Sequence, residues 1–185
     1  GKVFGSIAGT INAVALQEGG KIVVAGVRGI FPDTDFTLAR YNPDGTLDNS
    51  FDGNGTLTTA IGTGADTAYA LAIQSDGKIV VAGIRGTYNF AVFRFLENGS
   101  IDSSFADNGI FTFDPFWFNG SGFAESIALQ SDGKIVVCGE YDFNTAAIVV
   151  RLNTNGTLDS SFNGTGKLTR EYNGCNTSAN SLALQ

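Results

Sequence analysis

The chain has 185 residues, of which 43% are hydrophobic, so it is long enough to bury a core and is not disordered by composition. Its 18 acidic and 11 basic residues give a formal net charge of −7, which disfavours nucleic acid and anionic lipid as partners. The sequence contains no run of about 18 apolar residues, the length that a membrane span requires, so we expect no membrane insertion.

A ten-residue segment occurs three times along the chain, as QEGGKIVVAG at 17–26, QSDGKIVVAG at 74–83 and QSDGKIVVCG at 130–139. The intervals between the glutamines that open these segments are 57 and 56 residues, and Gln185 follows after another 55. Self-similarity at a fixed period is typical of repeat architectures. The sequence therefore predicts three repeats of about 56 residues.

Each repeat is expected to contain four short strands. The first resembles LALQ and turns at Ser-Asp-Gly, a hairpin signal, into the second, KIVVAG. The third reads FTLAR, AVFRF or AIVVR, and the fourth reads TLTT, IFTF or KLTR. A short meander of this kind predicts a four-stranded antiparallel sheet.

The second and third strands are apolar at consecutive positions, whereas a sheet with one wet face would alternate apolar and polar residues. Sheets buried on both faces and stacked radially form a β-propeller, so we predict an all-β protein built of propeller-type blades. The expected parts are the closing strand of a preceding blade (1–11), blade 1 (12–69), blade 2 (70–126), blade 3 (127–180) and the first strand of a next blade (181–185).

The LALQ strand with QSDGKIVVAG, followed by F-x-x-x-R-Y-N-x-D-G-T-L-D-x-S-F, resembles the delta-60 repeat of bacterial surface and secreted proteins, a β-propeller family. The resemblance covers nearly the whole chain, three times. It implies an extracellular or cell-surface location and implies no catalytic residues or cofactor. Such repeats come in longer arrays, and three blades are fewer than the roughly four to eight that close a ring.

The connections between strands two and three and between successive blades vary in length, whereas the other two are constant. In a meander, the variable connections emerge on one face, where binding functions concentrate. The candidate binding residues on this face are Phe31, Asp33, Asp35, Phe116, Trp117, Phe118 and Phe123. These aromatics stack on sugars or anchor a protein partner in one interpretation; in the simpler one they fill the gap between two blades.

An arginine precedes an aspartate by eight residues in every repeat. The pairs are Arg40 with Asp48, Arg94 with Asp102 and Arg151 with Asp159. We favour structural ion pairs over a catalytic role, because an active site does not normally repeat in every blade, and an arginine between packed blades needs a partner.

Asp44 and Asp48 in NPDGTLD are weak calcium candidates. Asn98 and Asn155 replace Asp44 in the other repeats, which favours a turn-forming role, since either residue bonds its own backbone in a turn. We therefore expect no metal and no cofactor.

The chain contains no histidine, which removes the Ser-His and Cys-His nucleophile pairs. Glu125 and Glu140 occur once each and are the best catalytic candidates, although no catalytic residue is assigned. Cys138 replaces an alanine of the other repeats and is expected to pack as a small apolar residue, with a disulfide to Cys175 as the alternative.

The sequence thus favours a non-enzymatic extracellular module that binds its own copies, other surface proteins or glycans through its variable face or blade edges. The alternatives are a carbohydrate-active hydrolase that uses acidic residues and a subunit of a repeat-built fibre. Because methionine is absent even at position 1, we expect a processed product or a piece of a longer array. A chain of three blades exposes a sheet edge and an apolar blade face at each end, so we expect that the isolated chain is not a stable monomer.

Overall fold

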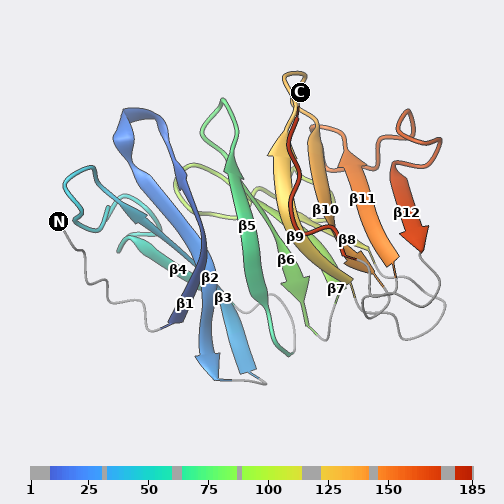
Figure 1. The fold of residues 1–185 in the computed structure, drawn as a ribbon. Coiled ribbons are helices and arrows are strands. Elements are labelled where there is room, and N and C mark those ends of the chain that lie inside the picture. The colour runs from blue at the N-terminus through green and yellow to red at the C-terminus, as the bar shows by residue number, and fades with distance from the viewer. Residues whose placement is uncertain are drawn as a thin grey trace.

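The computed structural model describes residues 9–30, 33–59, 64–86, 89–113, 122–141, 146–171 and 178–184. Within these ranges the chain forms three four-stranded antiparallel sheets that follow one another from the N-terminal to the C-terminal end (Figure 1). One short 3-10 helix is present among the described residues, and it is too short to cross a membrane. The predicted all-β fold with three propeller-type blades is confirmed.

The three sheets share one meander topology, in which each strand pairs with its neighbour in the chain. The first sheet contains β1 (Gly9–Leu16), β2 (Ile22–Ile30), β3 (Asp33–Tyr41) and β4 (Thr56–Thr59), with the 3-10 turn η1 (Glu18–Gly20) between β1 and β2. The second contains β5 (Thr67–Ile73), β6 (Ile79–Arg85), β7 (Asn89–Phe95) and β8 (Ile110–Phe113). The third contains β9 (Gly122–Leu129), β10 (Ile135–Tyr141), β11 (Ala146–Leu152) and β12 (Lys167–Glu171).

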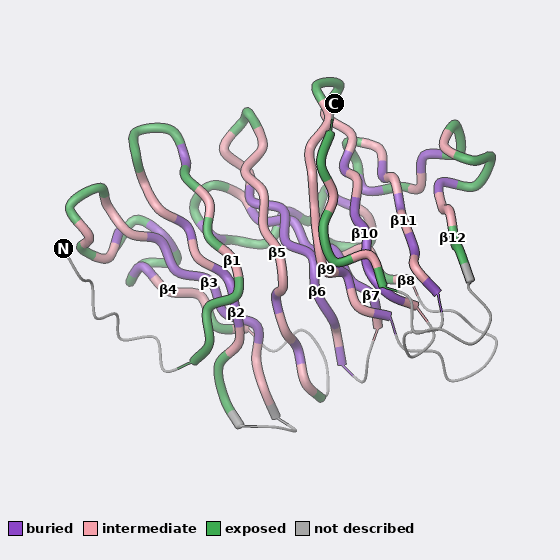
Figure 2. The backbone as a smooth tube through the Cα atoms, in the orientation of Figure 1, coloured by how far each residue is buried: buried purple, intermediate pink, exposed green. Residues whose placement is uncertain are grey.

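The middle sheet explains why consecutive positions of KIVVAG are apolar. Val81 packs toward the first sheet, in a cluster with Phe36 and Phe93, while the adjacent Val80 packs toward the third sheet. Both faces of β6 and β7 are therefore buried, as the colouring of Figure 2 shows for the centre of the molecule. Radial stacking of three sheets thus produces two hydrophobic layers, one at each interface between blades.

Each first strand carries a β-bulge, and a glycine of the second strand makes room for it. The register of β5 against β6 shifts between Ala68 and Ala70, which leaves Tyr69 as the extra residue. A Cβ atom added to Gly83 opposite the bulge would lie 2.0 Å from the backbone oxygen of Thr67. The same approach occurs at the glycines that end the other two copies of the segment, so the glycine of KIVVAG is required by the bulge.

The two ends of the chain differ from the expected boundaries. Residues 9–11 belong to β1 and not to a preceding blade's closing strand, while residues 1–8 lie outside the described range. The sheets begin at Gly9, Thr67 and Gly122, a few residues before the expected positions.

Residues 178–184 run alongside β9, where Figure 1 shows the C-terminal segment in red. The Ala179 amide donates to the Gly139 oxygen over 3.3 Å, and the Leu182 amide donates to Ser126 Oγ over 3.3 Å. Ala179 has the repeat position of Ala68 and Ala124, which pack against the preceding sheet. The segment therefore lies where the first strand of a following sheet would lie, although no strand is assigned to its described residues.

Candidate functional site

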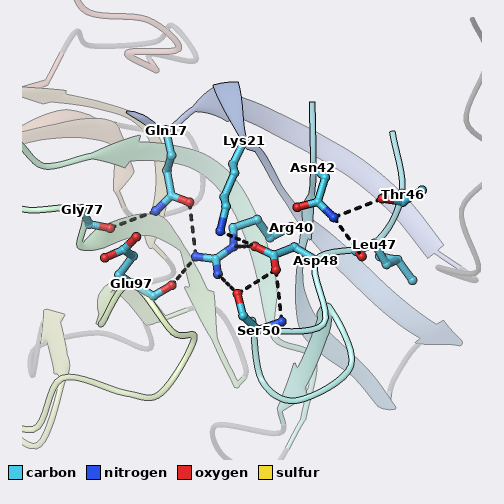
Figure 3. A network of polar contacts seen from close by, with 10 residues as sticks. All are labelled: Gln17, Lys21, Arg40, Asn42, Thr46, Leu47, Asp48, Ser50, Gly77 and Glu97. Atoms are coloured by element: carbon cyan, nitrogen blue, oxygen red, sulfur yellow. Dashed lines mark hydrogen bonds and ion pairs between the residues drawn. The ribbon is translucent and has the colours of Figure 1, made fainter. Parts of the chain in front are cut away.

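An arginine of the first sheet joins the first and second sheets (Figure 3). Arg40, on β3, donates from Nε to Asp48 Oδ2 over 2.7 Å and from Nη2 to Ser50 Oγ over 3.0 Å. Its Nη1 donates to the backbone oxygen of Glu97, which lies in the turn after β7 of the second sheet. One guanidinium group is thus shared between its own blade and the next.

The second sheet repeats this arrangement against the third. Arg94 donates from Nε to Asp102 Oδ2 over 2.8 Å, and its Nη2 lies 3.4 Å from Ser104 Oγ. Its Nη1 donates to the backbone oxygen of Thr154 over 2.5 Å. The repeat of the bonds shows that the invariant spacing of eight residues serves the junction between blades.

A phenylalanine lies against Arg40 and against Arg94, and each of these two rings is covered by the next blade. The Arg40 guanidinium carbon lies 5.0 Å from the centre of the Phe51 ring, and Phe51 is fully buried. A Cβ atom added to Gly99 of the second sheet would lie 3.0 Å from that ring. Phe105 and Gly156 repeat the contact between the second and third sheets.

Backbone hydrogen bonds complete the junction. The Asp52 amide donates to the Asn98 oxygen over 2.9 Å, and the Ala106 amide donates to the Asn155 oxygen over 2.8 Å. We call this set of contacts the interblade clasp. At the first junction, the donor half consists of Arg40, Phe51 and the Asp52 amide. The acceptor half consists of the backbone oxygens of Glu97 and Asn98 together with Gly99.

The donor half on the third sheet is unoccupied by any described residue. Arg151 bonds Asp159 over 2.6 Å and Ser161 over 3.0 Å, but no described acceptor meets its Nη1. The Arg151 side chain is 21% exposed, against 3% for Arg40 and 7% for Arg94.

The first sheet presents the complementary acceptor half. Pro43, Asp44 and Gly45 have the repeat positions of Glu97, Asn98 and Gly99. No described donor meets the backbone oxygens of Pro43 and Asp44, and both residues are exposed. The described part of the molecule thus has an open donor half at one end and an open acceptor half at the other.

Hydrogen bonds keep the aspartates that pair with the clasp arginines ionised. The Lys21 ammonium, which lies 2.7 Å from Asp48, and the Ser50 hydroxyl hold the pKa of Asp48 far below its usual range. The pKa of Asp159 is lowered in the same way, first of all by the Ser161 hydroxyl. These carboxylates act as permanent acceptors for the arginines.

At Asp102, in the second sheet, desolvation is the largest influence on the carboxyl pKa. Desolvation acts to raise the pKa of Asp102, but the hydrogen bonds from Ser104 and the charge of Arg94 outweigh it, so the pKa is lowered. The ion pair is therefore maintained between two packed blades.

The calcium candidates are engaged in turns. Asp44 Oδ1 accepts from the Thr46 amide over 2.9 Å and from its hydroxyl over 2.7 Å. Asn98 Oδ1 makes the same two bonds to Ser100, and Asn155 repeats them in the third sheet. The asparagine side chains thus make the same two hydrogen bonds in this turn as the aspartate does. No group of three acidic, histidine or cysteine side chains within the described ranges is placed to hold a metal ion.

The structure describes three of the seven candidate binding residues. Phe31, Phe116, Trp117 and Phe118 lie outside the described residues. Asp33 and Asp35 were expected in a loop, but they lie on β3, because the β2–β3 ladder continues to the pair Ile30 and Asp33. Phe123 lies on β9, not in a loop, with its ring centre 6.2 Å from that of Tyr69.

Glu125 and Glu140 lie close enough to influence each other. Glu125 is the bulge residue of β9, at the repeat position of Tyr69, and Glu140 is on the paired strand β10. Burial raises the pKa of both carboxyls, and the charge of Glu125 raises the pKa of Glu140 further. Burial and the charge of Glu125 also raise the pKa of the Cys138 thiol to about 11. Cys138 forms no disulfide and packs as a buried side chain.

The acceptors of the clasp could not be predicted from residue types, because they are backbone oxygens, which every residue has. The constant length of the loops that carry Glu97 and Thr154 is the signal that could have revealed them, since a fixed loop is needed to place a carbonyl against an arginine. Sequence reasoning also missed Tyr69, whose pKa is raised by burial and by the charges of Glu125 and Glu140.

The stacked four-stranded meanders with a repeated junction define the class of β-propeller repeat proteins. Residues 17–51, 74–105 and 130–162 match the family described as a β-propeller domain of unknown function, DUF5122. The chain belongs to this family. A search of curated proteins found no match to the chain.

Proposed function

We propose that the chain is a non-enzymatic structural and binding module whose end faces associate with matching blades, including those of further copies of the chain. The observation that carries the proposal is the open interblade clasp, with a donor half on the third sheet and an acceptor half on the first. Each half is identical in chemistry to one that is filled at the two internal junctions.

Apolar exposure on the first sheet supports the proposal. Val14 and Leu16 on β1 are 65% and 70% exposed. Leu71 and Ile73 have the same repeat positions on β5 and pack against the first sheet's core cluster. A matching blade would bury the exposed pair in the same way, and burial of apolar area stabilises by about 25 cal/mol per Å².

On the third sheet, residues 178–184 cover part of the face, over Cys138, Gly139 and Ser126. These residues and β1 are copies of one repeat segment. Association with a second copy therefore exchanges this segment for the incoming β1, while Arg151 receives a carbonyl.

Sedimentation velocity tests the proposal. The wild-type chain is expected to form larger species as its concentration rises, and Leu16→Asp is expected to remain monomeric because a carboxylate on the end face opposes burial. Thr112→Asp, which adds the same charge on an exposed position of β8, is the control and should associate like the wild type. A wild-type chain that is monomeric at every concentration would contradict the proposal.

An extracellular or cell-surface location is part of the proposal. The resemblance of the repeats to the delta-60 repeats of bacterial surface and secreted proteins supports it. Protease accessibility on intact cells that produce the protein is the measurement; protection from added protease until the cells are lysed would contradict it.

The second candidate function is a carbohydrate-active hydrolase, favoured by the adjacent Glu125 and Glu140. A glycosidase needs one protonated carboxyl as the acid and a second, ionised one as base or nucleophile. The charge of Glu125 raises the pKa of Glu140 beyond the effect of burial, which fits Glu140 as the acid and Glu125 as its ionised partner. A screen on polysaccharides decides between the functions. Turnover that Glu125→Gln and Glu140→Gln each abolish would establish the hydrolase and overturn the non-enzymatic module.

A further inference from the structure

A groove of about 630 Å³ lies between the outer strands of the second and third sheets. Its lining includes Phe113 from β8, Tyr141 from β10, and Lys167 and Arg170 from β12. The volume lies within the roughly 300–1,000 Å³ of small-molecule sites in proteins. The groove is therefore large enough for one or two sugar rings.

Two aromatic rings and an ammonium group meet in this groove. The ring centres of Phe113 and Tyr141 lie 5.9 Å apart, with the planes inclined by 38°. Lys167 Nζ lies 4.1 Å from the centre of the Phe113 ring. Aromatic rings offer rigid apolar surface for the C–H faces of a sugar, and the ammonium group offers three donors to a carboxylate.

The charge of the groove is opposite to that of the whole chain. Lys167 and Arg170 form no ion pair with a described carboxylate, and no carboxylate is among the described residues that line the groove. Lys78 and Lys134, by contrast, each lie within 4.0 Å of an aspartate oxygen. Two cations without a carboxylate partner among the described residues, in a chain of net charge −7, favour an anionic ligand.

Neutral polar groups border the same space. Asn163 donates from Nδ2 to the Lys167 oxygen over 2.8 Å, which leaves its side-chain oxygen as an acceptor without a described donor. The hydroxyl of Thr165 also lines the groove. Amide and hydroxyl groups beside an aromatic floor suit the hydroxyl groups of a sugar.

The repeat supplies an internal comparison. A groove of about 320 Å³ occupies the matching place between the first and second sheets, but Thr59 stands at the repeat position of Phe113, and Ile110 stands at that of Lys167. Asp52 also lines this first groove. The aromatic and cationic residues thus occur in only one of these two equivalent grooves. Because both junctions need the same packing, packing alone does not explain them.

We propose that the groove between β8 and β12 binds an acidic sugar residue of a saccharide. The sugar face stacks on the rings of Phe113 and Tyr141, and its carboxylate accepts hydrogen bonds from the Lys167 ammonium, with Arg170 at the rim. Of the lining residues, Asn163 also belongs to the open donor half through its backbone amide, but the contacts proposed for the sugar at Phe113, Tyr141 and Lys167 do not use that amide.

Isothermal titration calorimetry with a trisaccharide of galacturonic acid tests the proposal on the whole chain. We expect binding of the acid trisaccharide and at least about tenfold weaker binding of its methyl ester, because the ester has lost the charge that Lys167 recognises. Lys167→Ile places the residue of the sibling groove at this position and should weaken binding of the acid about tenfold. Phe113→Thr should weaken both ligands.

Lys78→Ile removes the same charge from the β5–β6 hairpin and should bind the acid like the wild type. If Lys167→Ile fails to fold, as judged by circular dichroism, Lys167→Gln serves in its place. Equal binding of acid and ester, unchanged binding by the Lys167 variant, or no binding by the wild type would each overturn the proposal. Sedimentation of the same samples is independent of these outcomes and reports the end-face association separately.

Discussion

At the scale of single residues, two requirements explain why the repeats keep their pattern. The glycine that ends KIVVAG admits the carbonyl of a bulge, and the arginine eight residues before an aspartate reaches the next blade. Both requirements arise from contacts to backbone oxygens, so neither depends on the identity of the residue contacted.

Gly83→Ala tests the first requirement. The added methyl group would lie 2.0 Å from the Thr67 oxygen, so the variant should lose about 3 kcal/mol of unfolding free energy. Gly53→Ala is the control: Gly53 has a φ of 76° but no atom near the new methyl group, and it should cost only about 1 kcal/mol. Urea denaturation provides both values, and an equal loss in the two variants would contradict the role of the bulge.

Arg94→Ala tests the second requirement. It leaves the buried Asp102 carboxylate without its partner and should cost about 3 kcal/mol. Arg151→Ala removes the equivalent side chain at the open end, which is partly exposed and meets no described carbonyl, and should cost about 1 kcal/mol. Guanidinium denaturation of the two variants, measured on dilute monomeric protein, checks the order; the reverse order would refute the clasp.

At the scale of strands, the sequence predicted the four strands of each repeat because the apolar pattern and the Ser-Asp-Gly turn are local signals. It placed the start of each first strand a few residues too late, since the bulge at Asn12, Tyr69 and Glu125 interrupts the alternation of side chains. It placed Phe123 in a loop because aromatic density resembles a binding loop, whereas the residue continues the ladder of β9.

Glu125, the bulge residue of β9, leads to a prediction about how the unfolding free energy depends on pH. Burial raises the pKa of Glu125 in the folded chain above the usual value of about 4.3, so the fold loses stability as pH rises through that range. Glu125→Gln removes this loss. The variant should therefore match the wild type near about pH 4 and become more stable than it toward about pH 7.

Urea denaturation of the wild type and Glu125→Gln at several pH values measures this difference. The clasp aspartates have lowered pKa values and titrate below this window, and they are present in both proteins, so they cancel. A difference in unfolding free energy that stays constant with pH would show that the carboxyl is not desolvated.

At the scale of the whole molecule, the repeat determines both the stability of the interior and the character of the ends. The two internal junctions bury phenylalanines, pair charges and satisfy backbone amides, and the outer faces display the same groups unfilled. The sequence anticipated exposed end faces from the repeat count. It could not show which atoms are left open, because the clasp forms between residues about 46 to 60 positions apart.

Amide hydrogen exchange at Asn163 tests the open clasp most directly. Its amide has the repeat position of the Asp52 and Ala106 amides, which donate across the two internal junctions. In dilute protein, we predict slow exchange at Asp52 and Ala106 and fast exchange at Asn163, with protection of Asn163 appearing as the concentration rises. Exchange at Asn163 that is equally slow in dilute protein, or that stays fast while the chain associates, would contradict the account.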